Sequence, residues 1–108
     1  MIFCKFYYQE NKICGFTFSG HSGYAKAGSD IVCAAVSSAA QFAVCGISEI
    51  IGQQCDISME NGVIQCFLAG KDKKKLRECG LFLKTLEVFV RQLESQYKEF
   101  IKVSIAEV

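Results

Sequence analysis

The segment CDISMENGVIQCFL, residues 55–68, decides the fold more than any other part of the chain. Asn61 and Gly62 stand at its centre, and Asn-Gly is the dipeptide most typical of a two-residue type I′ turn. On both sides, apolar residues alternate with polar ones, a pattern typical of strands with one buried face. We therefore predict a β-hairpin with strands at 55–60 and 63–68.

A second hairpin is predicted at the N-terminal end. Residues 2–9 are rich in aromatic and β-branched side chains, which favour strands. Glu10-Asn11 suits a tight turn, and residues 12–19 alternate between two faces. The alternation places Phe16 on one face of the strand and Ile13 on the opposite face.

One helix is predicted between the two hairpins. It starts at Ser29 or Asp30, either of which can cap it, and ends near Ile51, before Gly52. Apolar residues recur along it at helical spacing, and its other faces also carry apolar residues. We expect most of this helix to be buried, and its alanines would allow close approach to a sheet or to a second subunit.

The remaining elements complete an α+β domain. Residues 70–75 are interpreted as a charged turn, followed by a second helix from Leu76 to about Tyr97 and a last strand over residues 100–106. The predicted order is β-β-α-β-β-α-β, with two helices packed against a mainly antiparallel sheet. A length of 108 residues supplies one core, so residues 1–108 are predicted to form a single domain.

Charge and hydropathy exclude several classes of protein. The net charge of +1 is too small for a general nucleic-acid binder that works through bulk charge, so no direct nucleic-acid binding is expected. Lys71 and the lysines at 73–75 are interpreted as a solvated face. Polar residues interrupt the apolar stretch 31–51, so no membrane span is predicted. The N-terminal residues lack the order of a secretory signal, and we expect a cytoplasmic protein.

The seven cysteines form no recognisable framework. Successive cysteines are at least ten residues apart, so the chain lacks a C-x-x-C pair and no metal site or cofactor is predicted. Without a secretion signal, a disulfide framework is not expected. Most of these cysteines are predicted to be small buried residues, the usual position of a free cysteine.

Cys33 differs from the other six because it falls three or four residues into the first predicted helix. The free main-chain N–H groups and the positive dipole end of a helix stabilise an anion such as a thiolate. His21 is the only histidine of the chain and lies in the glycine-rich segment that leads to this helix. A cysteine beside an imidazole base is the minimal activated thiol nucleophile. The residues alone leave the alternative that Cys33 is a packing residue and His21 a surface residue.

Helical spacing adds two neighbours to Cys33. Asp30 lies three residues before it and Ser37 four residues after it, so all three share one face. Asp30 can hold His21 in the required tautomer, or it can simply cap the helix. Ser37 can bind the substrate or its own backbone. Both alternatives remain open at this stage.

The sequence around these residues is similar to that of a known family. Residues 20–25 are GHSGYA and residues 28–37 are GSDIVCAAVS. They resemble the pattern G-H-x-x-Y, then G-x-D-I-V-C-A-A-V-S, of the ribosomal-processing cysteine protease family Prp. The resemblance implies that Cys33 is the nucleophile and His21 the base. It also matches family positions near the site at Gly20, Tyr24, Asp30 and Ser37.

The resemblance further implies a substrate and an assembly. Such enzymes are cysteine endopeptidases that remove a short N-terminal extension from large-subunit ribosomal protein L-twenty-seven, through an acyl-enzyme. They cut after paired phenylalanines, need no cofactor and form homodimers, so the L-twenty-seven precursor and a second copy of the chain are the expected partners. Ser22 stands where many members have alanine, a small change from which we expect little effect.

Two further functions remain open from the sequence. The chain can be a non-catalytic ribosome-assembly module that binds ribosomal RNA or protein through its lysine cluster. It can also be a redox-sensing thiol protein that uses Cys33, although no second cysteine lies nearby in the sequence. Replacement of Cys33 would leave the binding of the assembly module intact, and a sensor would form a defined, reversible oxidised product.

Overall fold

The two hairpins and two helices occur in the predicted order. The structure, a computed structural model, describes residues 1–21 and 30–108. Its elements are β1 (Ile2–Gln9), β2 (Lys12–Gly20), α1 (Ile31–Cys45), the π-helical segment η1 (Gly46–Ile51), β3 (Cys55–Glu60), β4 (Val63–Leu68), α2 (Lys73–Gln96) and β5 (Ile101–Glu107). The predicted α+β class and element order are therefore confirmed.

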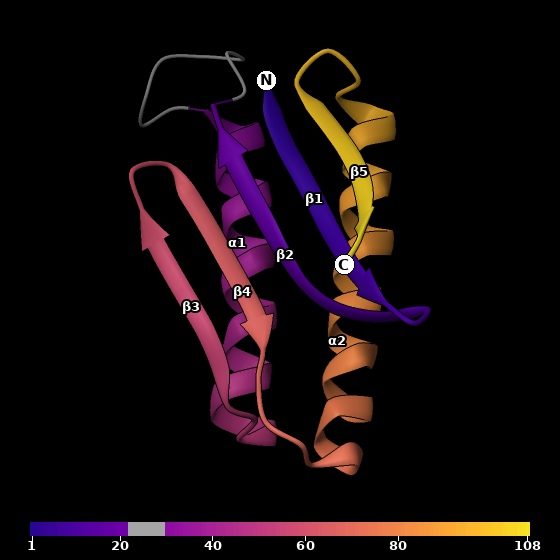
Figure 1. Ribbon diagram of the computed structural model, residues 1–108. Coiled ribbons are helices and arrows are strands. Elements are labelled where there is room, and N and C mark those ends of the chain that lie inside the picture. Colours follow the sequence, from indigo (N-terminus) through magenta and orange to yellow (C-terminus); the bar gives the residue numbers. More distant parts are fainter. Residues whose placement is uncertain (22–29) are drawn as a thin grey trace.

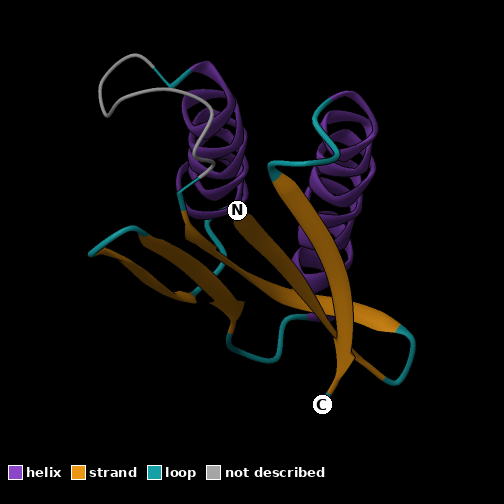
Figure 2. Cartoon of the chain, turned by 90° about the horizontal axis from the view of Figure 1, so that it is seen from above, coloured by secondary structure: helices purple, strands orange, loops and turns teal. Residues whose placement is uncertain are grey.

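The strands form one five-stranded sheet in the order β3-β4-β2-β1-β5 (Figure 1). Three of the four strand pairs are antiparallel, and β1 pairs with β5 in parallel. Both helices lie on the same face of the sheet, as Figure 2 shows. The fold thus has two layers, and the prediction of a mainly antiparallel sheet packed by two helices is confirmed.

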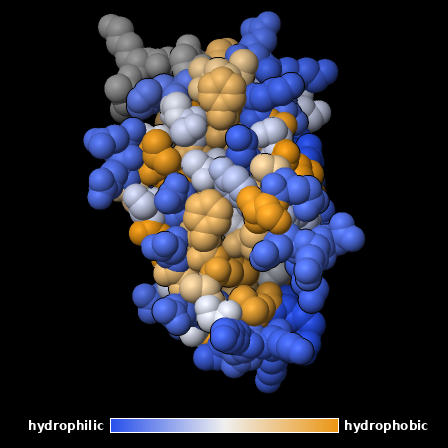
Figure 3. All heavy atoms as spheres, viewed as in Figure 1, coloured by the Kyte–Doolittle hydropathy of each residue, from blue (hydrophilic) through white to orange (hydrophobic). Residues whose placement is uncertain are grey.

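The core lies between this face of the sheet and the two helices. Phe6, Phe16 and Phe18 are buried and form an aromatic cluster, with ring centroids 5.5 Å apart for Phe6 and Phe18 and 4.8 Å apart for Phe16 and Phe18. Val36 of α1 and Leu83 of α2 are buried with them in the same core cluster. The opposite face of the sheet remains open, and apolar side chains run along its middle between hydrophilic ones (Figure 3).

Both hairpin turns use a left-handed backbone. In the β3–β4 turn φ is 52° at Asn61 and 76° at Gly62, as a type I′ turn requires. In the β1–β2 turn φ is 51° at Glu10 and 65° at Asn11. The two turns therefore have the same kind of backbone, but only the β3–β4 turn carries a glycine.

The predicted alternation in β2 is wrong at its first residues. Tyr7 pairs with Gly15 but Tyr8 pairs with Ile13, so Cys14 is an extra residue at a bulge. The extra residue reverses the faces of the residues before it, and Ile13 is buried like Phe16. Cys14 itself is half-buried, and its thiol donates to the carbonyl oxygen of Tyr7 at 3.4 Å.

The helix boundaries differ from the predictions in two places. The first helix extends to Ile51 as predicted, but its last residues wind as the π-helical segment η1 before Gly52, whose φ is 74°. The second helix begins at Lys73, within the segment interpreted as a turn. Asp72 explains this start, because its side chain accepts a hydrogen bond from the Lys75 main-chain N–H at 3.1 Å and caps the helix.

The stretch Ile31–Ile51 has the length and apolarity of a membrane span, by those two criteria alone. The expectation that its polar residues disqualify it is therefore wrong. In the fold this stretch is a core helix that places Val32, Val36, Ala40 and Ile47 against the sheet. Its apolar residues are therefore explained by packing in the core of the domain.

A buried carboxylate joins α2 to the sheet. Glu87 is 3 % exposed and accepts hydrogen bonds from the Tyr8 hydroxyl of β1 and from Arg91 Nε at 2.9 Å. Lys84 Nζ lies 3.4 Å from the same carboxylate. Burial raises the pKa of Glu87, but the hydrogen bonds from Tyr8 and Arg91 outweigh it, and the pKa lies below the usual 4.5.

Glu87→Ala is expected to lower the free energy of unfolding at pH 7 by about 1–3 kcal/mol, because it leaves the half-buried Tyr8 hydroxyl without its acceptor. A lowered folded-state pKa stabilises the fold above the unfolded pKa, and this contribution disappears as the pH falls through the folded pKa. The difference between wild type and variant, measured by urea unfolding, should therefore shrink from pH 7 to pH 3. A difference that is constant with pH would contradict this assignment.

Candidate active site

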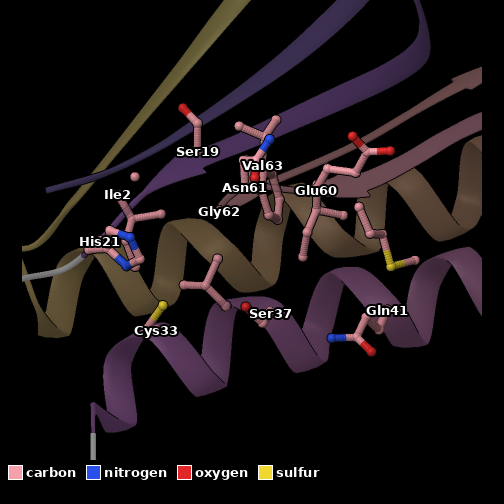
Figure 4. A pocket seen from close by; sticks show the side chains of 15 residues that line it. Ile2, Ser19, His21, Cys33, Ser37, Gln41, Glu60, Asn61, Gly62 and Val63 are labelled. Atoms are coloured by element: carbon pink, nitrogen blue, oxygen red, sulfur yellow. The ribbon is translucent and has the colours of Figure 1, made fainter. Parts of the chain in front are cut away.

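A cavity of about 240 Å³ opens where β2 ends and α1 begins (Figure 4). Four parts of the chain form its walls: one face of α1, the start of β1, the end of β2, and the β3–β4 hairpin around its turn. The lining residues are Ile2, residues 18–21, Cys33, Val36, Ser37, Gln41 and residues 59–64. The cavity therefore contains both residues that the sequence marks as a candidate nucleophile and its base.

Cys33 lies in the first turn of α1. Its side chain is half-buried, and the sulfur points into the cavity (Figure 4). The helix cap fixes this position, because Cys33 is the third residue after Asp30. The main-chain N–H groups of this first turn lack acceptors within the helix, so those that are not capped can donate hydrogen bonds to a negative group in the cavity.

Asp30, rather than Ser29, is the cap of this helix in the described residues. Its carboxylate oxygen Oδ1 accepts a hydrogen bond from the Cys33 main-chain N–H at 3.0 Å. Asp30 is not among the residues that line the cavity. The capping interpretation is thus confirmed, and an orienting role toward His21 stays a prediction.

His21 directly follows β2, and main-chain contacts at the end of that strand fix its place. Gly20 has a φ of 94°, and a Cβ atom there would lie 2.5 Å from the carbonyl oxygen of Met1. Only glycine allows the two main-chain segments to come this close, which explains why a glycine precedes His21. The Met1 amino group donates a hydrogen bond to the His21 carbonyl oxygen, so the backbone of His21 is tied to the start of β1.

The His21 ring lies against the β3–β4 turn. A Cβ atom on Gly62 would be 3.6 Å from His21 Nε2. The antiparallel pairing of β2 with β4 causes this contact, since Ser19 pairs with Val63 and the turn therefore lies beside the end of β2. The ring is exposed at the mouth of the cavity.

The His21 ring and the Cys33 sulfur lie at the same end of the cavity (Figure 4). Within the part of the chain that the structure describes, no hydrogen bond joins them. An exposed imidazole can rotate about its side-chain bonds, and both groups face the same cavity. The arrangement can deprotonate a thiol and return the proton to a departing group.

The other cysteines have different surroundings. Burial raises the pKa of the Cys4 thiol to about 12, with a contribution from the Glu94 carboxylate. Burial and the neighbouring Cys55 raise the pKa to about 12 at Cys66 and to about 11 at Cys79. Burial also raises the pKa of Cys14. Of the seven cysteines, Cys33 is the one that lines the cavity.

The expectation that most cysteines are buried is only partly met. Cys4, Cys66 and Cys79 are buried, whereas Cys45 is exposed and the other three are half-buried. All seven are free thiols in the structure. Among residues 1–21 and 30–108, no cluster of three or more histidine, cysteine or acidic side chains is arranged to hold a metal ion.

Of the remaining candidate residues, two line the cavity and one lies outside the described residues. Gly20 and Ser37 both line the cavity with Cys33 and His21. Tyr24 lies outside the described residues. The sequence reasoning missed Gln41 and the β3–β4 turn as parts of the wall. Gln41 could have been found, because it is eight residues after Cys33 and therefore on the same helical face.

Comparisons with known proteins identify a family and several solved structures of the same fold. Residues 1–102 match the family described as cysteine protease Prp. The ribosomal processing protease Prp of S. aureus, solved with a covalently linked product peptide, has a TM-score of 0.87 and 23% identity, over 98% of this chain and 100% of that chain. SMU.848 from Streptococcus mutans has a TM-score of 0.85 and 22% identity, over 100% of this chain and 96% of that one. No curated protein matches the chain.

Proposed function

The chain belongs to the cysteine protease Prp family, and from this premise we propose that Cys33 and His21 are its catalytic dyad and that it removes the N-terminal extension of ribosomal protein L-twenty-seven. That the chain is a cysteine protease follows from the family itself. The observation that carries the assignment of the dyad is the shared cavity, which holds the chain's only histidine and a cysteine at a helix start. The similar S. aureus protein is a ribosomal processing protease, which supports a ribosomal protein as the substrate.

The proposed reaction has two stages. Cys33 Sγ attacks the carbonyl carbon of the scissile bond while His21 takes the thiol proton. The C–N bond then breaks, His21 gives the proton to the departing amine, and an acyl-enzyme thioester remains. In the second stage His21 deprotonates a water molecule that hydrolyses the thioester, and the proton returns to the Cys33 sulfur.

The negative oxygen of each tetrahedral intermediate needs hydrogen-bond donors. The main-chain N–H of Cys33 already donates to Asp30. The proposed donors are therefore the other N–H groups in the first turn of α1, at Ile31 and Val32, which have no acceptor within the helix. Asp30 then supports the site by holding the first turn in place.

The walls of the cavity suit an apolar segment of substrate. Ile2, Phe18 and Val36 line it beside Cys33, and all three side chains are buried. An aromatic side chain placed among them would lose water-exposed apolar surface, which favours binding. This environment supports cleavage next to phenylalanine.

The length of the cavity along α1 limits the number of substrate residues that can contact it. Cys33, Ser37 and Gln41 follow one another at intervals of four residues on one face of α1. They span about 12 Å along the helix axis at about 1.5 Å per residue. An extended peptide advances about 3.3 Å per residue, so this wall contacts about three or four substrate residues.

Mass spectrometry of an L-twenty-seven precursor tests this function. The precursor with its N-terminal extension is incubated with wild type and with Cys33→Ala, and the masses of both products are measured. We expect a single cut after paired phenylalanines with wild type only. An uncut precursor, or a cut that Cys33→Ala makes equally well, would contradict the proposal, and an intact complex without cleavage would favour the non-catalytic assembly module.

We also propose that the enzyme acts as a homodimer in the cytoplasm, where ribosomal proteins are made. Small and apolar residues of α1 and α2 line an open groove of about 600 Å³ on the outside of the helices. Phe42 and Leu81 line this groove and are 74 % and 72 % exposed. A second copy that covered them would remove a large apolar patch from water.

Phe42→Glu is expected to weaken the dimer about tenfold or more, because a charge would have to be buried in the apolar interface. Light scattering coupled to size-exclusion chromatography measures the mass of each form. Phe3→Glu is the matched control, since Phe3 is 53 % exposed on β1 and does not line this groove. A monomeric wild type, or a dimer that dissociates only in the control, would exclude this interface.

A further inference from the structure

The proposed dyad needs an imidazole held in one place, and the described contacts of the His21 side chain supply only one firm neighbour. Within residues 1–21 and 30–108, no hydrogen bond to the ring is formed, and His21 is held by its backbone. The Asp30 carboxylate accepts from the Cys33 main-chain N–H, and Asp30 does not line the cavity.

The neighbour of the ring within these residues is the β3–β4 turn. A Cβ atom on Gly62 would lie 3.6 Å from Nε2 and 3.8 Å from Cε1 of His21, so the bare main chain of Gly62 faces the ring edge that carries Nε2. Asn61 and Gly62 both line the cavity (Figure 4). The positive φ values of the turn fix its shape independently of the histidine.

We propose that Gly62 is a positioning residue for the His21 base: the β3–β4 turn stands beside the ring, and the lack of a side chain at position 62 keeps Nε2 open to water and substrate. This inference deepens the proposed function and rests on it. A methyl group at position 62 would stand at van der Waals distance from Nε2. It would displace water from that nitrogen and hinder the approach of the thiol and the substrate to it.

Gly62→Ala tests the inference, with Asn11→Ala as the matched control. Both substitutions place alanine at the second residue of a hairpin turn with positive φ, 76° at Gly62 and 65° at Asn11. The backbone strain is therefore comparable, but the control turn lies at the other end of β2, away from the cavity. Gly62→Asn is a second variant that keeps the turn, because asparagine tolerates a left-handed backbone.

His21 is the only histidine, so long-range ¹H–¹⁵N NMR of the imidazole reports on this ring alone. We expect both Gly62 variants to shift the ring signals and to lower kcat by about three- to tenfold with little change in KM. Asn11→Ala should leave the ring signals and kcat as in wild type.

Three outcomes would overturn the inference. The first is that the ring signals and kcat of folded Gly62→Ala and Gly62→Asn match those of wild type. The second is that Asn11→Ala changes kcat as much as the Gly62 variants do. The third is that the loss of activity in the Gly62 variants lies wholly in KM. The proposed function fails separately, if His21→Ala retains the activity of wild type. In that case the ring contact can still be measured by NMR, but Gly62 would have no base to position.

Discussion

Cys33→Ala is expected to lower the rate of precursor cleavage by about 10⁴-fold or more, to the background of uncatalysed hydrolysis. The sulfur is the atom that forms the thioester, and no other cysteine lines the cavity, so no neighbouring thiol can replace it. The side chain is only half-buried, and alanine is a good helix former. The melting temperature should therefore stay near that of wild type.

Cys45→Ala is the control for this experiment. Cys45 is the last residue of α1 and is exposed outside the cavity. Single-turnover cleavage, followed by separation of the products, should show wild-type rates for Cys45→Ala. If Cys45→Ala loses activity and Cys33→Ala retains it, the nucleophile has been assigned to the wrong end of the helix.

His21→Ala is expected to lower kcat by about 10²- to 10⁴-fold, the usual contribution of a positioned general base. The loss should be partly reversed by free imidazole in the buffer, because removal of an exposed ring at the cavity mouth leaves room for a small base. Rescue by added imidazole distinguishes a lost base from a damaged fold.

The pH profile gives an independent test of His21. His21 is the sole histidine, so His21→Ala should change how kcat/KM depends on pH. Peptide hydrolysis measured over a range of pH, with and without imidazole, provides both readouts. An unchanged profile, with no effect of imidazole, would show that another group acts as the base.

Local signals in the sequence predicted much of the fold. Asn61-Gly62 predicted the β3–β4 turn because only residues that tolerate positive φ fit a type I′ geometry. The bulge at Cys14 could not be predicted in this way, because it depends on the partner strand and leaves no local signal. The parallel pairing of β5 with β1 likewise depends on how α2 crosses the sheet.

The two candidate catalytic residues were predicted from the sequence, but one wall of the cavity was not. The start of α1 identified Cys33, and His21 was identified as the only histidine of the chain, before the family resemblance supported both. The wall formed by the β3–β4 turn could not be predicted, since Gly62 lies beside His21 through the pairing of Ser19 with Val63 between strands far apart in the sequence. Such register is fixed by the packing of the whole sheet, and a local pattern does not contain it.

The central claim is that one sulfur, that of Cys33, is the nucleophile, and covalent labelling tests it most directly. A peptide chloromethyl ketone that ends in Phe-Phe is incubated with the enzyme, and peptide mass spectrometry then locates the adduct among the seven cysteines. We predict one adduct per chain, on Cys33, formed in step with the loss of activity and much more slowly in His21→Ala. An adduct on another cysteine that abolishes activity, with Cys33 unmodified, would contradict the account.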